Sequence, residues 1–201
     1  MASNEKTDSN RLKSYLFLGR AYWKKQLPED ALQILQMGLK EIDEQNSENK
    51  TDKAVIYNHI GLVYESQGQC QEALEYFQKS LDIVRKIYGE EHSDTAANYS
   101  NIGSIYHSKG QSEKALEYLQ KSLDIKRKIY GEEHPDTATS YSIIGSIYES
   151  QRKYDKALEY FQKSLDIKRK IYREEHPYIA SSYYCIRSAY RSQEKYEKAL
   201  E

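Results

Sequence analysis

The sequence has few cysteines, no long apolar run and almost no net charge, and each deficit excludes a class of protein. Only two of its 201 residues are cysteine, Cys70 and Cys185, and they form neither a CxxC pair nor a disulfide framework. A reducing compartment is the simplest setting for such a chain, so we expect a cytoplasmic protein. No stretch approaches the ~20 apolar residues of a membrane-spanning helix, and no apolar signal segment follows Met1. We therefore expect no membrane partner.

The charge balance argues against nucleic acid as a partner. Lysine and arginine together number 30, aspartate and glutamate 31, and the net charge at pH 7 is −1. Proteins that mainly bind phosphate backbones carry a basic excess or a basic stripe. We therefore expect no nucleic-acid partner.

Motifs that carry catalysis are also missing. The sequence contains no glycine-rich phosphate loop, no HExxH and no GxSxG. Cys70 falls in an expected turn between helices, and nothing near it in the sequence points to an activated thiol. We expect a protein that is not an enzyme and has no catalytic residues and no cofactor.

What the sequence does contain is a repeated segment. The stretch EKALEYLQKSLDIKRKIYGEEHPDTA, residues 113–138, recurs with small edits from Gln71 and from Asp155. A single active site would not need three such copies. The period is 42 residues, as shown by Tyr22, Tyr64, Tyr106, Tyr148 and Tyr190 and by Gly19, Gly61, Gly103 and Gly145. We predict a polar, disordered tail over 1–10 and an array over 11–201, with repeats at about 12–53, 54–95, 96–137 and 138–179 and a partial repeat at 180–201.

Hydrophobic spacing within a copy predicts two helices. Tyr99, Ile102 and Tyr106 fall on one face of the first helix, and the apolar residues of 115–129 fall on one face of a longer second helix. Gly110 is suited to end the first helix in a left-handed conformation. The basic IKRKI stretch suits the negative end of the second helix. The pattern predicts an all-α fold of antiparallel helix pairs.

These residues resemble the tetratricopeptide repeat. That family's signature places an aromatic residue, Leu-Gly, Tyr, Ala and Phe at set offsets within about 34 residues. Here the offsets are filled by Tyr57, Ile60, Gly61, Tyr64, Ala73 and Phe77. The 42-residue period and the YGEEHPDTA linker resemble the variant found in kinesin light chains. The resemblance implies a right-handed superhelical solenoid that acts as a non-enzymatic protein–protein interaction module.

The family resemblance also implies where a ligand would bind. In tetratricopeptide proteins, the face of the first helix opposite the conserved packing stripe lines a concave groove that binds a peptide or a partner protein. At this face the copies differ, whereas their second helices are nearly identical. We expect Asn58 and Asn101 to hydrogen-bond to the ligand's backbone. The residues predicted to line the groove are Asn58, His59, Glu65, Asn101, Ser104, His107, Ser142, Ser146 and Glu149.

Two sets of repeated polar residues are expected to be structural. His92, His134 and His176 recur at the repeat spacing, but equivalent points on stacked helices lie about 8–10 Å apart or more, too far to share one metal ion. We expect them in linkers and helix caps, with no metal. The basic clusters at 126–128 and 168–170 could form a ladder that attracts an acidic partner. Because acidic pairs follow within a turn, we expect them instead to complement the helix dipoles.

The partial fifth repeat leaves other roles open. Its stripe of Tyr183, Ile186 and Tyr190 is expected to be exposed, which would allow self-association into a structural scaffold. The repeats could also be the sensor region of a larger signalling protein or enzyme. Arg187 replaces the glycine found at Gly145, so crowding at a close helix contact predicts that the fifth repeat is the least stable.

Overall fold

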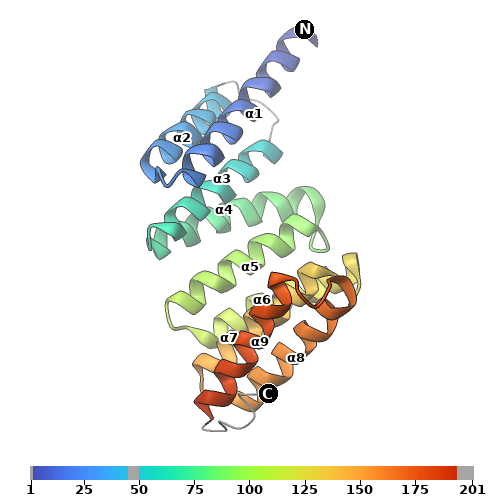
Figure 1. Cartoon of the computed structure of the whole chain (residues 1–201). Helices are drawn as coiled ribbons and strands as arrows, with labels where there is room; N and C mark the ends of the chain where they lie inside the picture. The colour runs from blue at the N-terminus through green and yellow to red at the C-terminus, as the bar shows by residue number, and fades with distance from the viewer. Residues whose placement is uncertain (1, 45–49, 194–201) are drawn as a thin grey trace. The chain divides into compact units, whose positions relative to one another are not determined.

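The computed structural model describes residues 2–44 and 50–193, and within these ranges every regular element is an α-helix (Figure 1). The all-α prediction is confirmed. The helices are α1 (Ala2–Lys24), α2 (Pro28–Glu44), α3 (Lys50–Ser66), α4 (Cys70–Tyr88), α5 (Ser93–Ser108), α6 (Ser112–Tyr130), α7 (Pro135–Ser150), α8 (Tyr154–Ile171) and α9 (Pro177–Ser192).

The chain divides into two compact units, Met1–Gly89 and Glu90–Glu201. In the first unit α1 packs on α2, α2 on α3, and α3 on α4; in the second, α5 packs on α6, α6 on α7, α7 on α8, and α8 on α9. Paired helices follow each other in sequence across short turns, so they run antiparallel (Figure 1). The helix pairs are confirmed, and the right-handed superhelical path stays a prediction.

The first helix differs from the sequence-based expectation for residues 1–10. Because α1 begins at Ala2, the backbone over 2–10 is helical where a disordered tail is predicted. No proline or glycine precedes Gly19, so nothing in the local sequence stops the helix from extending to its beginning. The first turns of α1 extend beyond the helices against which it packs (Figure 1).

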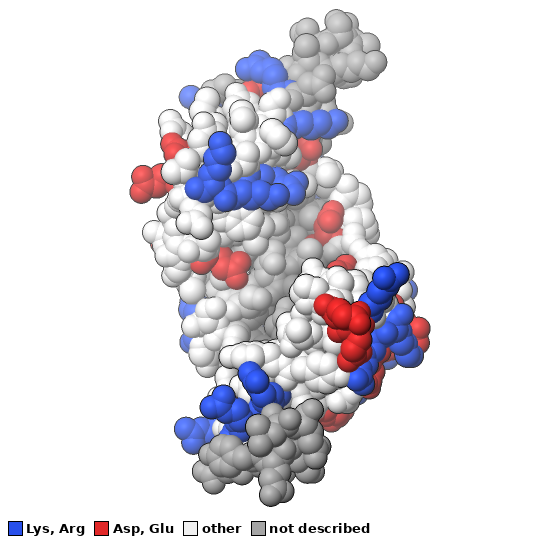
Figure 2. Space-filling view, viewed as in Figure 1, with Lys and Arg blue, Asp and Glu red and all other residues white. Residues whose placement is uncertain are grey.

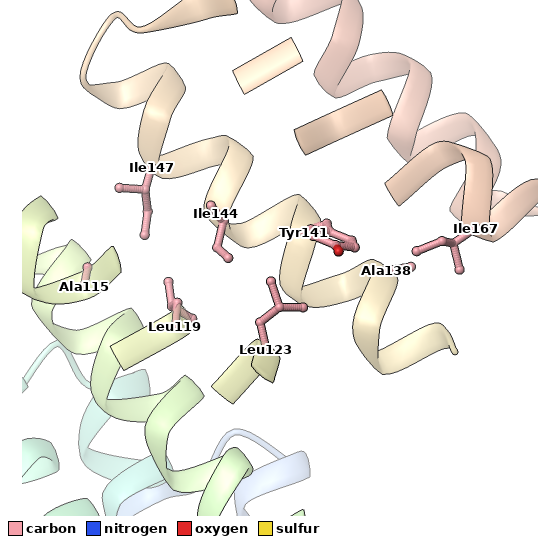
Figure 3. Close-up of a cluster of buried hydrophobic side chains, with 8 residues drawn as sticks. All are labelled: Ala115, Leu119, Leu123, Ala138, Tyr141, Ile144, Ile147 and Ile167. Atoms are coloured by element: carbon pink, nitrogen blue, oxygen red, sulfur yellow. The ribbon is translucent and has the colours of Figure 1, made fainter. Parts of the chain in front are cut away.

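The predicted packing stripes form the core of each helix pair. Gly103 allows α5 to approach α6, because a Cβ atom at this position would lie 2.7 Å from Cγ of Leu119. Gly145 has the same relation to Phe161 in the next pair. Figure 3 shows a core cluster to which α6, α7 and α8 contribute, made of Ala115, Leu119, Leu123, Ala138, Tyr141, Ile144, Ile147 and Ile167. The stripes predicted from helical spacing are therefore confirmed, except at Ile129, which is 40% exposed.

The turn inside each pair uses one left-handed residue at the repeat spacing. Gly68 and Gly110 have φ angles of +73° and +72°, as predicted for glycine caps. Gln26 and Arg152 occupy the equivalent positions with φ angles of 60° and 58°. The left-handed backbone conformation therefore recurs at this position of the repeat, and in two copies a residue other than glycine adopts it.

The repeated histidines cap the following helices. Nδ1 of His134 accepts a hydrogen bond from the backbone N–H of Asp136 at 3.1 Å, and its ring stacks on Tyr130 with centroids 4.4 Å apart. His92 and His176 make the same cap contact to the residue two positions later. The prediction of a capping role is confirmed.

Candidate functional site

All nine side chains predicted to line a groove are half-buried. Their positions differ from those of simple solvated surface residues, because neighbouring atoms cover part of each one. In the first unit the α3 face consists of Asn58, His59 and Glu65. In the second unit the α5–α7 face consists of Asn101, Ser104, His107, Ser142, Ser146 and Glu149.

The α3 face is formed by polar groups in a partly desolvated position. Burial, and secondarily the charge of Arg20, lowers the pKa of His59 to about 4, so its imidazole is neutral at neutral pH. Its Nδ1 is buried and has no hydrogen-bond partner within the described residues. Burial also raises the pKa of the Glu65 carboxyl, and no ion pair to Glu65 is found in the described part of the chain. The face therefore holds an imidazole nitrogen without a hydrogen-bond partner and a carboxyl without an ion pair, both counted within the described residues.

On the α5–α7 face, the α7 residues are already engaged within the protein. The Ser142 hydroxyl is 2.7 Å from that of Ser164, and the Ser146 hydroxyl donates to the backbone carbonyl of Ser142 at 3.1 Å. Glu149 accepts a hydrogen bond from Ser188 of α9 at 2.8 Å. These contacts fix the side chains and reduce what they can offer a ligand.

The α5 residues of this face have more unused hydrogen-bonding capacity. Nδ1 of His107 is buried and lacks a partner in the described ranges, as does Nδ1 of His59. A neutral imidazole has one donor and one acceptor nitrogen, and a buried polar atom without a partner carries an energetic cost. The unused capacity of the two units therefore lies mainly on α3 and α5.

Two lysines that were expected at exposed helix ends point inward instead: Lys168 is buried and Lys126 is half-buried. Lys168 is only 8% exposed and donates hydrogen bonds to the hydroxyls of Ser182 at 2.9 Å and Ser142 at 3.4 Å. Lys126 makes equivalent bonds to Ser140 and Ser100, at 3.0 and 3.2 Å. Burial lowers the pKa of both ammonium groups. The idea of one exposed basic ladder is therefore wrong, because one lysine of each cluster points inward.

The other cations of these clusters form exposed ion pairs. Arg127 lies 2.5 Å from Glu132, and Lys128 pairs with Glu91. Arg169 and Lys170 repeat the arrangement in the next copy. On the face drawn in Figure 2, charges of both signs lie in small groups with uncharged surface between them. The structural role expected for the helix-end cations is supported.

The fifth repeat departs from its predicted exposure. Tyr183 is 41% exposed, but Ile186 and Tyr190 are half-buried, and Ile186 packs near Phe161. The exposed stripe is therefore confirmed only for Tyr183. The predicted second helix falls in 194–201, outside the described residues.

Arg187 is exposed, with its guanidinium 5.5 Å from the centroid of the Tyr184 ring. In the other repeats the equivalent glycine contacts a residue of the second helix 16 positions later, as from Gly145 to Phe161. The predicted crowding at Arg187 involves the second helix of its own repeat, which lies outside the described residues, so it stays a prediction.

Within the described ranges, no group of His, Cys, Asp or Glu is arranged to hold a metal ion. None of the helices in these ranges combines the length and the apolar character that crossing a membrane requires.

Comparison with known families agrees with the geometry. The family model of the tetratricopeptide repeat matches residues 52–128, 100–170 and 136–201. The chain belongs to the tetratricopeptide repeat family. A repeat module of this family serves as a protein-interaction or scaffold unit, on a fold that is generally non-catalytic. A search of curated proteins finds no significant match to the sequence.

Solved structures show the same tetratricopeptide fold. BtubC (BKLC) from P. vanneervenii has a TM-score of 0.82 at 17% identity, over 97% of this chain and 85% of that chain. A putative kinesin light chain of Podosopora anserina with nearly identical repeats has a TM-score of 0.80 at 24% identity, over 94% and 90%. The apo form of RapI reaches 0.79 at 23% identity, over 94% of this chain and 66% of that one. In fold, this chain therefore resembles the repeats of the putative kinesin light chain.

Proposed function

We propose that the chain binds a peptide segment or a partner protein through the α3 face and the α5–α7 face. The observation that carries the proposal is the pair of buried, unpartnered nitrogen atoms, Nδ1 of His59 and Nδ1 of His107. Leaving a buried acceptor unpaired costs about 1–3 kcal/mol. Because both atoms are shielded from solvent, the imidazole must rotate toward the ligand, and pairing with a ligand N–H would then remove that cost.

The surrounding groups favour an extended backbone as the ligand. Asn101 offers both a donor and an acceptor, and Ser104 offers a hydroxyl, one helical turn from each other on α5. Glu65 adds a half-buried carboxylate on α3. Such short polar side chains can pair with successive peptide groups without large hydrophobic anchors on the ligand.

The proposal can be tested with peptides selected from a random library on the immobilised full chain. Their affinities are then measured by fluorescence anisotropy. We expect Asn101→Ala combined with His107→Leu to weaken a selected peptide about tenfold, because two hydrogen bonds of about 0.5–1.5 kcal/mol each are lost. The matched control is Lys128→Gln with Lys170→Gln, which alters the exposed helix ends alone. If the control variant loses the peptide and the α5 variant keeps it, the ligand binds the helix ends and the proposal is wrong.

A second candidate is self-association through α9. Tyr178 and Tyr184 are 54% and 65% exposed on this helix, an unusual exposure for large aromatic side chains. Light scattering over a dilution series tests this role. A mass that falls on dilution, and that Tyr184→Ser reduces to the monomer value, would support it; a constant monomer mass would exclude it.

A further inference from the structure

A second surface, separate from the α3 face and the α5–α7 face, lies in the first unit. Helices α3 and α4 form a cavity of about 620 Å³ lined by four lysines, Lys50, Lys53, Lys79 and Lys86. Asp82 is the acidic residue among its described lining residues. The cavity therefore combines a strong excess of positive charge with room for a small organic group.

Among the described residues, three of the four lysines have no carboxylate as an ion-pair partner. The Lys53 ammonium lies 2.6 Å from the Asp43 carboxylate, which neutralises its charge. Lys79 instead lies over the ring of Tyr76, 4.7 Å from the centroid. Lys50 and Lys86 form no ion pair within the described residues. Asp82 already accepts a hydrogen bond from Gln78 at 2.8 Å.

The later repeats show what is different about the position of Lys79. Lys121 and Lys163, at the equivalent positions of the next two copies, form ion pairs with Glu117 and Glu159 at 2.7 and 2.6 Å. The near-identity of the sequences makes these copies internal controls for the second repeat.

Lys86 differs in another way: Lys79 keeps a glutamate at the position equivalent to Glu117, namely Glu75, whereas the partner position of Lys86 has no carboxylate. Lys128 and Lys170, its equivalents, pair with Glu91 and Glu133. In the sequence, the residue 42 positions before Glu91 is Asn49, an amide without charge. The second repeat thus retains the lysines found in the later repeats but lacks one of the carboxylates that pair with them there.

The cavity also has an apolar part. Tyr57, Ile83 and Ile87 line it beside the lysines, and Ile87 is 41% exposed. An apolar group that covers such a side chain gains free energy in proportion to the area removed from water. A purely inorganic anion would leave this part of the cavity unused.

We infer that this cavity binds a phosphate monoester carried on an apolar group, such as an aryl phosphate. A phosphate monoester carries a charge of about −1.5 to −2 at pH 7, which matches several uncompensated lysines better than a single carboxylate does. Lysine binds phosphate as a point charge. The aryl group contacts Tyr57, Ile83 and Ile87, while Lys79, Lys86 and Lys50 surround the phosphate.

The test uses the full chain, phenyl phosphate as the probe, and two-dimensional NMR as the readout. Saturable shifts confined to residues of α3 and α4 are expected. Inorganic phosphate, which lacks the ring, and phenol, which lacks the charge, should both bind more weakly than phenyl phosphate. Equal binding of phenol, or shifts outside α3 and α4, would overturn the inference.

Matched variants locate the charge. Lys79→Gln with Lys86→Gln should weaken phenyl phosphate binding at least about threefold, because two exposed charges that face the phosphate are lost. Lys121→Gln with Lys128→Gln removes the equivalent, ion-paired lysines of the next repeat and should leave the affinity unchanged. Equal losses in both variants would mean a general charge effect and would overturn the site. Circular dichroism checks that both variants remain folded.

Further probes distinguish two possible carriers of the aryl phosphate, a phosphorylated partner protein and a small-molecule ligand. A peptide that contains phosphotyrosine and free phosphotyrosine are compared on the wild-type chain. Tighter binding of the peptide indicates a phosphorylated partner protein, and equal binding indicates a small-molecule ligand. Failure of both to bind would overturn the inference while leaving the proposed peptide-binding faces untouched.

Discussion

The Lys168 ammonium donates a hydrogen bond to the Ser182 hydroxyl at 2.9 Å, in a position where only 8% of the lysine is exposed. This bond joins α8 to α9, because Ser182 lies on the first helix of the following repeat. The Ser182 hydroxyl in turn donates to the backbone carbonyl of Tyr178 at 3.0 Å. A buried cation is thus held by hydroxyl groups, without a carboxylate partner among the described residues.

Lys168→Met should leave the protein as stable as before at pH 7, or more stable by about 1 kcal/mol, because well-packed apolar groups often replace buried charges at no cost. Val84 stands at the equivalent position of an earlier repeat and is 4% exposed, so the site accepts an apolar side chain. Urea denaturation of both proteins measures the difference. A loss above about 2 kcal/mol would show that the serine–lysine bonds dominate.

The same pair of proteins should respond differently to pH. Burial lowers the pKa of Lys168 in the folded state, so the folded protein loses this proton more easily than the unfolded chain. The cost of burying the charge is full below the folded pKa and disappears as the pH rises toward the unfolded value of about 10.4. The wild type should therefore gain stability relative to Lys168→Met between pH 7 and pH 10. Tyrosine ionisation affects both proteins and cancels in the difference.

Arg152→Gly should stabilise the second unit by about 0.5–1 kcal/mol. Arg152 has a φ angle of 58°, and this left-handed conformation costs a residue with a side chain about 1–2 kcal/mol. Glycine avoids that cost, but it also increases the conformational entropy of the unfolded chain, which offsets part of the gain. Gly110→Ala is the reciprocal control and should destabilise, although nothing lies within 4 Å of the added Cβ. Urea midpoints measure both; a shift of the same sign in the two variants would contradict the conformational explanation.

Gly103→Ala should destabilise by about 1–3 kcal/mol for a different reason, which is steric. The new Cβ would meet Cγ of Leu119 at 2.7 Å and the backbone carbonyl oxygen of Ala115 at 3.2 Å. The side chain can move, but the backbone oxygen cannot move easily. Gly103→Ala should therefore cost more than Gly110→Ala, and thermal denaturation ranks the two. An unchanged melting temperature for Gly103→Ala would show that the helices separate without penalty.

Much of this fold could be predicted from the period alone, because each position is observed several times. Gly103 and Gly145 make equivalent helix contacts in successive repeats, and His92 and His134 cap equivalent helices. An interpretation that holds for one copy therefore holds for the others. The beginning of the first helix could not be predicted in this way, because residues 2–10 are mostly polar and composition alone does not distinguish a solvated helix from a disordered tail.

The inward direction of Lys126 and Lys168 was missed because the KRK clusters read as a single charged surface. Successive helix residues point about 100° apart, so three adjacent cations cannot share one face. The signal was present in the sequence: Ile42 and Val84 occupy the equivalent positions of the first two repeats. An apolar residue at one repeat position indicates that the position is buried, and Lys126 and Lys168 occupy that same position in the later repeats.

His59 predicts a distinct pH dependence of stability. Its folded pKa is lowered to about 4, first by burial and then by the charge of Arg20, whereas an unfolded histidine titrates near its ordinary value. The unfolded chain therefore takes up the proton first as the pH falls. The stability that His59 contributes is complete above about pH 6.5 and is lost progressively down to about pH 4, by roughly 3 kcal/mol at most.

His59→Gln should remove this part of the pH profile. Denaturation midpoints at pH 7, 5.5 and 4.5 for both proteins give the comparison, and the histidine's own NMR titration gives the pKa directly. A His59 that titrates near pH 6.5 in the folded protein would contradict the burial argument.

The last prediction concerns binding and uses one substitution on each proposed face, Asn58→Ala on α3 and Asn101→Ala on α5. Each asparagine can donate to and accept from a peptide backbone, and each lost bond costs about 0.5–1.5 kcal/mol. If the effects add, a selected peptide should bind about one to two orders of magnitude more weakly. Because both side chains lie outside the buried core, helicity should be unchanged, which circular dichroism checks. Normal binding by this variant, together with lost binding when the exposed Lys128 and Lys170 become glutamines, would place the ligand on the helix ends and refute the assignment of both faces.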